Sequence, residues 1–253
     1  MRRLSLLLLI ALLTPACGKK GALIYPDLLV PAAPTAVAVR QAGPSMKLVF
    51  SLPDVDKAGQ NITDLTGVKV LRHESVPGQE VDCSTCATDF QIFKTMYIDH
   101  LDSSSRRYGR LMVFLDSDVR AGREYAYKVL SFTKDNVDGE ASKPVLAVLV
   151  QAPLPPVLQA LSAPTEIKLE FVGLPPLEGD LAGYNLYRSV KGESLPFLAL
   201  NKELLTGNSY IDTGLERGVT YVYAARIVVR MPKGDLVESV LSNEAMAALR
   251  DDE

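Results

Sequence analysis

The chain of 253 residues contains no tryptophan, two histidines and three cysteines. Tryptophan is enriched at binding hot spots, so its absence removes the strongest aromatic anchor for a ligand. Two histidines leave no basis for a Ser-His-Asp set and little material for a metal centre. No Gly-rich phosphate loop and no HExxH motif occurs in the sequence. We therefore predict a protein that is not an enzyme and that holds neither a cofactor nor a metal ion.

The chain also lacks a large excess of either charge, because 27 basic and 30 acidic residues leave a formal net charge of −3. Nucleic-acid binding requires a basic patch or stripe, and this balance predicts none. Hydrophobic residues make up 47% of the chain, which is ordinary for globular domains. The composition favours a globular protein of one or two domains that does not bind nucleic acid.

The apolar run at 4–13 is too short to span a bilayer. It follows two arginines and is followed by Ala16, a small residue directly before Cys17. This order is typical of a secretory signal peptide, so we interpret residues 1–16 as a segment that is removed from the mature protein. Cleavage as an ordinary secretory signal near this place stays open beside the lipoprotein interpretation that follows.

Residues 14–17, Thr-Pro-Ala-Cys, resemble the lipobox of bacterial lipoproteins. The resemblance implies that Cys17 becomes the mature N-terminus and carries acyl chains. Two or more such chains give stable membrane anchoring, at about 0.8 kcal/mol per buried CH₂. Residues 18–26 are similar to the opening of small Gram-negative lipoproteins that associate with the outer-membrane lipopolysaccharide translocon, and Gly18 resembles an outer-membrane sorting pattern. These similarities imply a lipid-anchored outer-membrane protein that faces the periplasm or the exterior.

The most informative pattern occurs twice, with every residue of the second copy 96 positions after its counterpart in the first. Each copy has an aromatic-aliphatic-Asp triplet, then a glycine, then two tyrosines separated by one residue. The first copy ends on Tyr125 and Tyr127, and the second ends on Tyr221 and Tyr223. We interpret each copy as a strand, a turn and a second strand.

Further matches lie before each copy of this pattern. Residues 46–50 and 167–171 alternate apolar and polar side chains, and residues 64–72 match residues 180–188. A period of two indicates a half-buried strand. Such strands bury their apolar face only against a second sheet, which predicts an all-β protein built from β-sandwiches.

This ordered, duplicated set resembles the fibronectin type III module over residues 34–249. The resemblance implies two tandem immunoglobulin-like Greek-key β-sandwiches, with tyrosine corners at Tyr125 and Tyr221. Phe50 and Phe171 stand where the family has its core tryptophan.

A division of the chain follows from these matches. After the signal peptide, we expect a lipidated N-terminus and linker at 17–33, module 1 at 34–150 and module 2 at 151–250. The proline-rich stretch 151–156 is expected to stiffen the joint between the modules and to restrict their angle.

The two copies differ in length at two places. Between the third strand and the Asp-containing strand the first copy is 20 residues longer, which predicts an inserted hairpin or loop at about 73–110. Insertions on sandwich loops commonly carry function, so we expect a partner surface there. Within it, the polar run 103–108 is either part of this surface or a solvated loop. The second copy has four additional residues in its last hairpin, whose tip at 233–235 is explained by turn chemistry.

Cys83 and Cys86 lie in the insertion, between His73 and His100. An oxidising compartment favours a local disulfide between the two cysteines, which is our prediction. Two alternatives stay open. A redox-active pair requires a helix N-terminus to lower the thiol pKa, and a zinc site would use both cysteines and both histidines.

Asp116 and Asp212 occupy equivalent places in the repeat, and we expect them to cap a turn rather than to take part in catalysis. The sequence as a whole predicts a binding, spacer or assembly module of the cell envelope with a protein partner. The alternative is an accessory factor of the lipopolysaccharide translocon that acts through residues 17–26.

Overall fold

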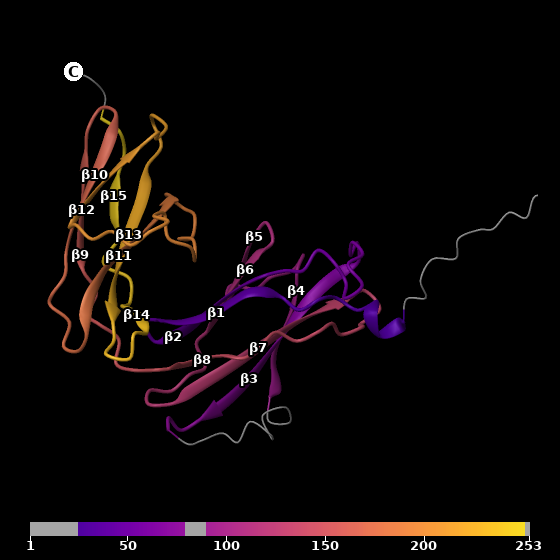
Figure 1. Ribbon diagram of the computed structural model, residues 1–253. Helices are drawn as coiled ribbons and strands as arrows, with labels where there is room; N and C mark the ends of the chain where they lie inside the picture. Colours follow the sequence, from indigo (N-terminus) through magenta and orange to yellow (C-terminus); the bar gives the residue numbers. More distant parts are fainter. Residues whose placement is uncertain (1–24, 79–89, 251–253) are drawn as a thin grey trace, which may run out of the picture.

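The computed structural model describes residues 25–78 and 90–250, where nearly all regular structure is β-strand (Figure 1). A short 3-10 helix, η1, spans Pro26–Leu28. Within these two ranges no helix is long and apolar enough to cross a bilayer. The strands are β1 (Thr35–Ala42), β2 (Ser45–Ser51), β3 (Leu65–Ser75), β4 (Gln91–Tyr97), β5 (Ser105–Tyr108), β6 (Leu111–Asp116), β7 (Glu124–Thr133), β8 (Val145–Val148), β9 (Val157–Ser162), β10 (Glu166–Val172), β11 (Asp180–Val190), β12 (Ser209–Thr213), β13 (Tyr221–Arg230), β14 (Leu236–Glu238) and β15 (Ala245–Ala247).

The first half of the described chain forms two facing sheets. One contains β1-β2-β6-β5 and the other contains β4-β3-β7-β8. In β2, Met46, Leu48 and Phe50 are buried and the residues between them are half-buried, so one face of the strand turns inward. These side chains pack with Tyr125 and Tyr127 in one apolar cluster between the sheets.

The second half repeats this arrangement. Its sheets are β12-β10-β9, and β11-β13 with β14 and β15 both paired along β13. Ile167, Leu169 and Phe171 are fully buried, whereas Lys168 between them is exposed. They belong to a second apolar cluster that also contains Tyr223. The alternation predicted from the sequence is confirmed in both copies.

The tyrosine corners form in both sandwiches. The hydroxyl of Tyr125 accepts a hydrogen bond from the backbone N–H of Arg120 at 2.8 Å. Its counterpart Tyr221 accepts one from the backbone N–H of Glu216 at 3.0 Å. Each bond ties the second strand of the repeat to the turn before it. The predicted fold class, all-β with two tandem immunoglobulin-like sandwiches, is confirmed.

One strand pair connects the sandwiches and was not predicted. β1 pairs in parallel with β14, with Gln41 opposite Val237 and Ala42 opposite Glu238. As a result, an eight-stranded sheet runs through both sandwiches, while their apolar clusters stay separate. Figure 1 shows the sandwiches set at an angle and meeting where β14 lies beside β1 and β2. The boundary at residue 150 and the role of the proline stretch remain predictions.

The longer region of the first copy adds one strand to each sheet. β4 pairs with β3, and β5 pairs with β6. The polar run at 103–108 is therefore mostly an edge strand rather than a solvated loop. Cys83 and Cys86 lie outside the described residues, as does Cys17, and the disulfide and the lipid anchor remain predictions.

Candidate functional site

The two histidines of the insertion lie at opposite ends of the β3–β4 pair. His73 is near the β3 end that pairs with Gln91, and His100 forms a bridge with Tyr97 at the other end. Gln91 and Tyr97 are six strand positions apart, which is about 20 Å. One zinc ion cannot bind both histidines across this distance, so the four-ligand zinc alternative is wrong for this fold. Among the described residues, no group of three or more His, Cys, Asp or Glu gathers to hold a metal ion.

Asp116 is buried at the end of the first core. Its carboxylate accepts hydrogen bonds from Arg72 Nη1 at 2.8 Å and from the Tyr127 hydroxyl at 2.7 Å. It also accepts the backbone N–H of Asp118 at 2.9 Å, which confirms the predicted turn cap. Burial and then the negative charge of Asp116 raise the pKa of Tyr127 above its ordinary value.

The second sandwich contains the same cluster. Arg188 Nη1 donates to both oxygens of Asp212 at 2.9 Å, and the Tyr223 hydroxyl donates to the same carboxylate at 2.8 Å. Burial is the largest cause that raises the pKa of Tyr223, followed by its hydrogen bond to Asp212. Both aspartates therefore hold an arginine and a tyrosine in place. A carboxylate engaged in this way is a structural group rather than a general base.

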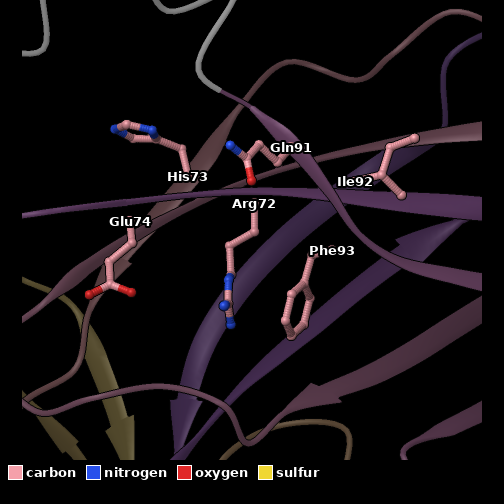
Figure 2. Close-up of a pocket in the computed structure, with 6 residues that line it drawn as sticks. All are labelled: Arg72, His73, Glu74, Gln91, Ile92 and Phe93. Atoms are coloured by element: carbon pink, nitrogen blue, oxygen red, sulfur yellow. The ribbon is translucent and has the colours of Figure 1, made fainter.

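A cavity of about 300 Å³ opens beside this cluster in the first sandwich, at one end of β3 and β4 (Figure 2). Figure 2 shows Arg72 and Phe93 pointing to the same side, and the guanidinium lies 3.6 Å from the ring centroid. Arg72 Nη2 also binds Asp118 at 3.0 Å, and Glu74 pairs with Arg123 at 3.4 Å. The two charged side chains of this cavity, Arg72 and Glu74, are already engaged in ion pairs. The lining residues are Arg72, His73, Glu74, Gln91, Ile92 and Phe93.

The most specific polar site is instead the joint between the sandwiches. Glu238 on β14 is buried, and its Oε1 accepts hydrogen bonds from Lys47 at 2.7 Å and Asn185 at 3.2 Å. Its Oε2 accepts the Tyr187 hydroxyl at 3.2 Å and lies 3.8 Å from Arg226 Nε. Lys47 belongs to the first sandwich and the other groups belong to the second. Lys47 and Glu238 are both largely removed from water. Their attraction offsets the cost of desolvation only because the remaining hydrogen bonds of the carboxylate are also made.

The first copy shows how this joint arises. The counterpart of Glu238 is Asp138, which binds Lys69 of its own sandwich at 2.6 Å with a side chain that is 45% exposed. At the position equivalent to Lys69, the second copy has the neutral Asn185. Glu238 therefore has no cation at that position and pairs with Lys47 of the other sandwich, where its own side chain is only 4% exposed.

The segments by which the two copies differ in length also make contacts between the sandwiches. The longer last hairpin of the second copy contains β14, which supplies Glu238 and pairs with β1. In the first copy, the extra strand β5 faces residues 195–197. There the Tyr108 hydroxyl accepts the backbone N–H of Phe197 at 2.9 Å, and Arg106 lies 5.0 Å from the ring of Phe197. Part of the region expected to be an external partner surface thus binds the neighbouring sandwich.

Two further contacts close the joint. The Gln41 side chain donates to the backbone oxygen of Val150 at 2.8 Å and accepts its N–H at 3.0 Å, which holds the start of the linker against β1. Gly43 donates its N–H to the backbone oxygen of Glu238 at 2.9 Å. Gly43 has φ +61°, and a Cβ there would lie 2.9 Å from Val240 Cγ1, so the close approach requires glycine.

The sequence pointed to the aspartates and tyrosines of the clusters but gave no role to the arginines. It placed a joint at the proline-rich stretch 151–156 but did not predict the β1–β14 pairing or the Lys47–Glu238 ion pair. A signal for the arginines was present, since Arg72 and Arg188 end the matched segments. A signal for the joint was present in the change from Lys69 to Asn185, which leaves Glu238 without the cation that its counterpart has.

No family model matches the chain, and no curated protein matches it. Among solved structures, that of the FN1–FN3 domains of chicken CNTN1 is similar over 88% of this chain and 68% of that chain, at 12% identity and a TM-score of 0.35. The structure of a Fn3-like protein from Clostridium thermocellum is similar over 41% of this chain and 99% of that chain, at 28% identity and a TM-score of 0.31. At these TM-scores the fold assignment rests on the strand order and the hydrogen bonds described above.

Proposed function

We propose that the chain is an outer-membrane lipoprotein whose two sandwiches form a rigid arm that serves as a binding, spacer or assembly module of the cell envelope. The observation that carries the proposal is the eight-stranded sheet through both sandwiches, closed by the buried Lys47–Glu238 pair. A flexible tether needs only a linker. Strand pairing and a desolvated ion pair between domains favour a constant angle instead. The proposal assigns no catalytic role to the chain.

The proposed anchor at Cys17 lies close in sequence to the end of the first sandwich that is remote from the second sandwich, as a projecting arm requires. Cys17 precedes Tyr25 by eight residues, which span at most about 29 Å when fully extended. In Figure 1, η1 lies at the end of the first sandwich that is remote from the second sandwich. Anchoring at Cys17 would therefore keep the η1 end close to the membrane and let the second sandwich project away from it.

The anchor is tested by labelling cells with a palmitate analogue. Wild-type protein is expected to incorporate the label and to fractionate with the outer membrane, whereas Cys17→Ala should lose both properties. Retention of the label in Cys17→Ala would overturn the lipoprotein part of the proposal.

The arm is tested by loosening the joint without touching the anchor. Glu238→Gln combined with a flexible Gly-Ser insertion after Val150 should disperse the crosslinks that a photoreactive residue on the second sandwich forms with envelope proteins. An unchanged crosslink pattern would contradict the rigid arm. If residues 17–30 alone restored outer-membrane assembly in a strain that lacks the protein, the translocon alternative would replace the arm.

A further inference from the structure

A second cavity lies at the joint, between the face of the shared sheet and the contact of β5 with residues 195–197. Its volume is about 170 Å³, and residues of both sandwiches line it. Much of the wall is apolar, with contributions from Leu115, Leu195, Pro196 and Phe197. The charged part of the wall consists of Lys47 from the first sandwich and Arg226 from the second.

The charges of this cavity are not balanced. Lys47 and Arg226 share one carboxylate, that of Glu238, at 2.7 Å and 3.8 Å. Their side chains are 12% and 16% exposed, so water screens them only in part. Within the described part of the chain, neither cation has a second acidic partner. The cluster therefore carries one positive charge in excess.

This excess affects Lys47 directly. Burial lowers the pKa of Lys47, and the nearby charges of Arg226 and Arg40 lower it further, although Glu238 acts in the opposite direction. Arg40 is the direct neighbour of Lys47 across the β1–β2 pair. In a partly enclosed site, an anion placed against such a cluster interacts more strongly than it would in water.

We propose that this cavity binds a small amphipathic monoanion, with its single negative charge between Lys47 and Arg226 and a short apolar body against the four apolar side chains. The volume gives room for roughly six groups of the size of a water molecule. Two sources carry this chemistry: a free short-chain carboxylate, and the phosphodiester headgroup region of an anionic lipid.

Binding would also affect the joint. Because the two cations belong to different sandwiches, one anion held by both links them, in addition to the link through Glu238. The inference goes beyond the proposed arm and does not depend on lipidation at Cys17. The proposal of an anion site and the proposal of a lipid anchor are therefore tested by separate experiments.

The test uses the full chain with Cys17→Ala, purified without detergent, and hexanoate as the probe in calorimetric titration. Hexanoate is expected to bind saturably at one site, whereas hexanol and hexylamine, which share its apolar body, should not bind. In NMR titrations of the lysine side chains, hexanoate should raise the pKa of Lys47. Vesicles of phosphatidylglycerol that displace hexanoate would point to a lipid source, and vesicles without effect would point to a free carboxylate.

Variants locate the site. Arg226→Gln should weaken hexanoate binding at least tenfold, and Arg230→Gln should leave it unchanged, because Arg230 is exposed four positions along the same strand and does not line this cavity. Leu195→Glu places a carboxylate in the cavity and should abolish binding in a protein that remains folded by circular dichroism. The proposal would be overturned by any of three results: hexanol binding as well as hexanoate, undiminished hexanoate binding by Arg226→Gln, or the absence of saturable hexanoate binding to the Cys17→Ala chain.

Discussion

At the scale of single residues, the two sandwiches are stabilised by the same three side chains. Arg72, Asp116 and Tyr127 in the first sandwich correspond to Arg188, Asp212 and Tyr223 in the second. Each aspartate is almost fully buried and has both a charged and a neutral donor. Removal of the carboxylate would leave a buried hydroxyl and a guanidinium without their partner, which is costly.

Asp212→Ala is therefore expected to lower the free energy of unfolding by about 3 kcal/mol or more. Urea denaturation monitored by tyrosine fluorescence measures the change. Asp235→Ala, which removes an exposed carboxylate at a hairpin tip, is the matched control and should stay within about 0.5 kcal/mol of wild type. Equal effects of the two substitutions would contradict the structural role of Asp212.

Asp102 gives a prediction for pH. Its hydrogen bonds with Lys94 and Ser104 lower the pKa of the carboxyl group from 3.8 to about 2. Because the folded pKa lies below the unfolded one, the contribution of Asp102 to stability is complete above about pH 4 and is lost as the pH falls towards 2. Carbon-13 NMR titration should detect this low pKa. The pKa of Asp102 should return towards 3.8 in Lys94→Met, which removes the first of these partners, and should stay low in the control Lys57→Met. A pKa of Asp102 near 3.8 in the wild type would refute this prediction.

At the scale of elements, both copies bend their third strand at the same place. The pairing register shifts between Leu65 and Gly67 in β3, and between Leu181 and Gly183 in β11. A Cβ at Gly67 would lie 2.4 Å from the backbone oxygen of Met96 and from the ring of Phe132. The strand bends here because glycine allows the neighbouring strands to come this close.

Gly67→Ala should therefore destabilise the first sandwich by about 3 kcal/mol, since backbone and ring atoms have little room to move. Gly207→Ala is the control, because nothing lies within 4 Å of the place that its methyl group would occupy and its φ is outside the left-handed region. Thermal unfolding followed by circular dichroism compares the two. If Gly67→Ala melted like Gly207→Ala, the bulge would not depend on the close approach.

The elements of the repeat could be predicted from the sequence, because each carries a local signal. Alternation at 46–50 and 167–171 predicts β2 and β10, and the repeated Gly122 and Gly218 mark turns that both have positive φ. The strands of the longer region could not be predicted individually. β4 and β5 have no counterpart in the other copy, and their pairing depends on β3 and β6 rather than on their own pattern.

At the scale of the whole molecule, a pair of charges far apart in the sequence links the two sandwiches. Lys47 and Glu238 are joined across the shared sheet, while the equivalent acid of the first copy, Asp138, forms an ion pair with Lys69 at the surface. Breaking a desolvated ion pair costs more stability than breaking an exposed one, which typically contributes about 0.2–1 kcal/mol to the free energy of folding.

Glu238→Gln should consequently loosen the joint, with an increased radius of gyration in small-angle X-ray scattering and two unfolding transitions in place of one. Asp138→Asn is the matched control, because it removes the equivalent exposed charge and should leave the scattering curve unchanged. A curve of Glu238→Gln that superimposes on that of the wild type would show that strand pairing alone holds the angle.

The sequence by itself determined the number of sandwiches, their inward-facing side chains and their tyrosine corners, because these depend on local periodicity and on a pattern present twice. Only the tertiary structure decided what the differences between the copies do. In the sequence, the neutral Asn185 indicates only that Glu238 lacks the cation of its counterpart. Neither Asn185 nor the added β5 nor the longer last hairpin identifies Lys47 as the partner of Glu238. Their meaning depends on Lys47 lying next to Glu238, and that proximity exists only once both sandwiches have folded and β1 has paired with β14.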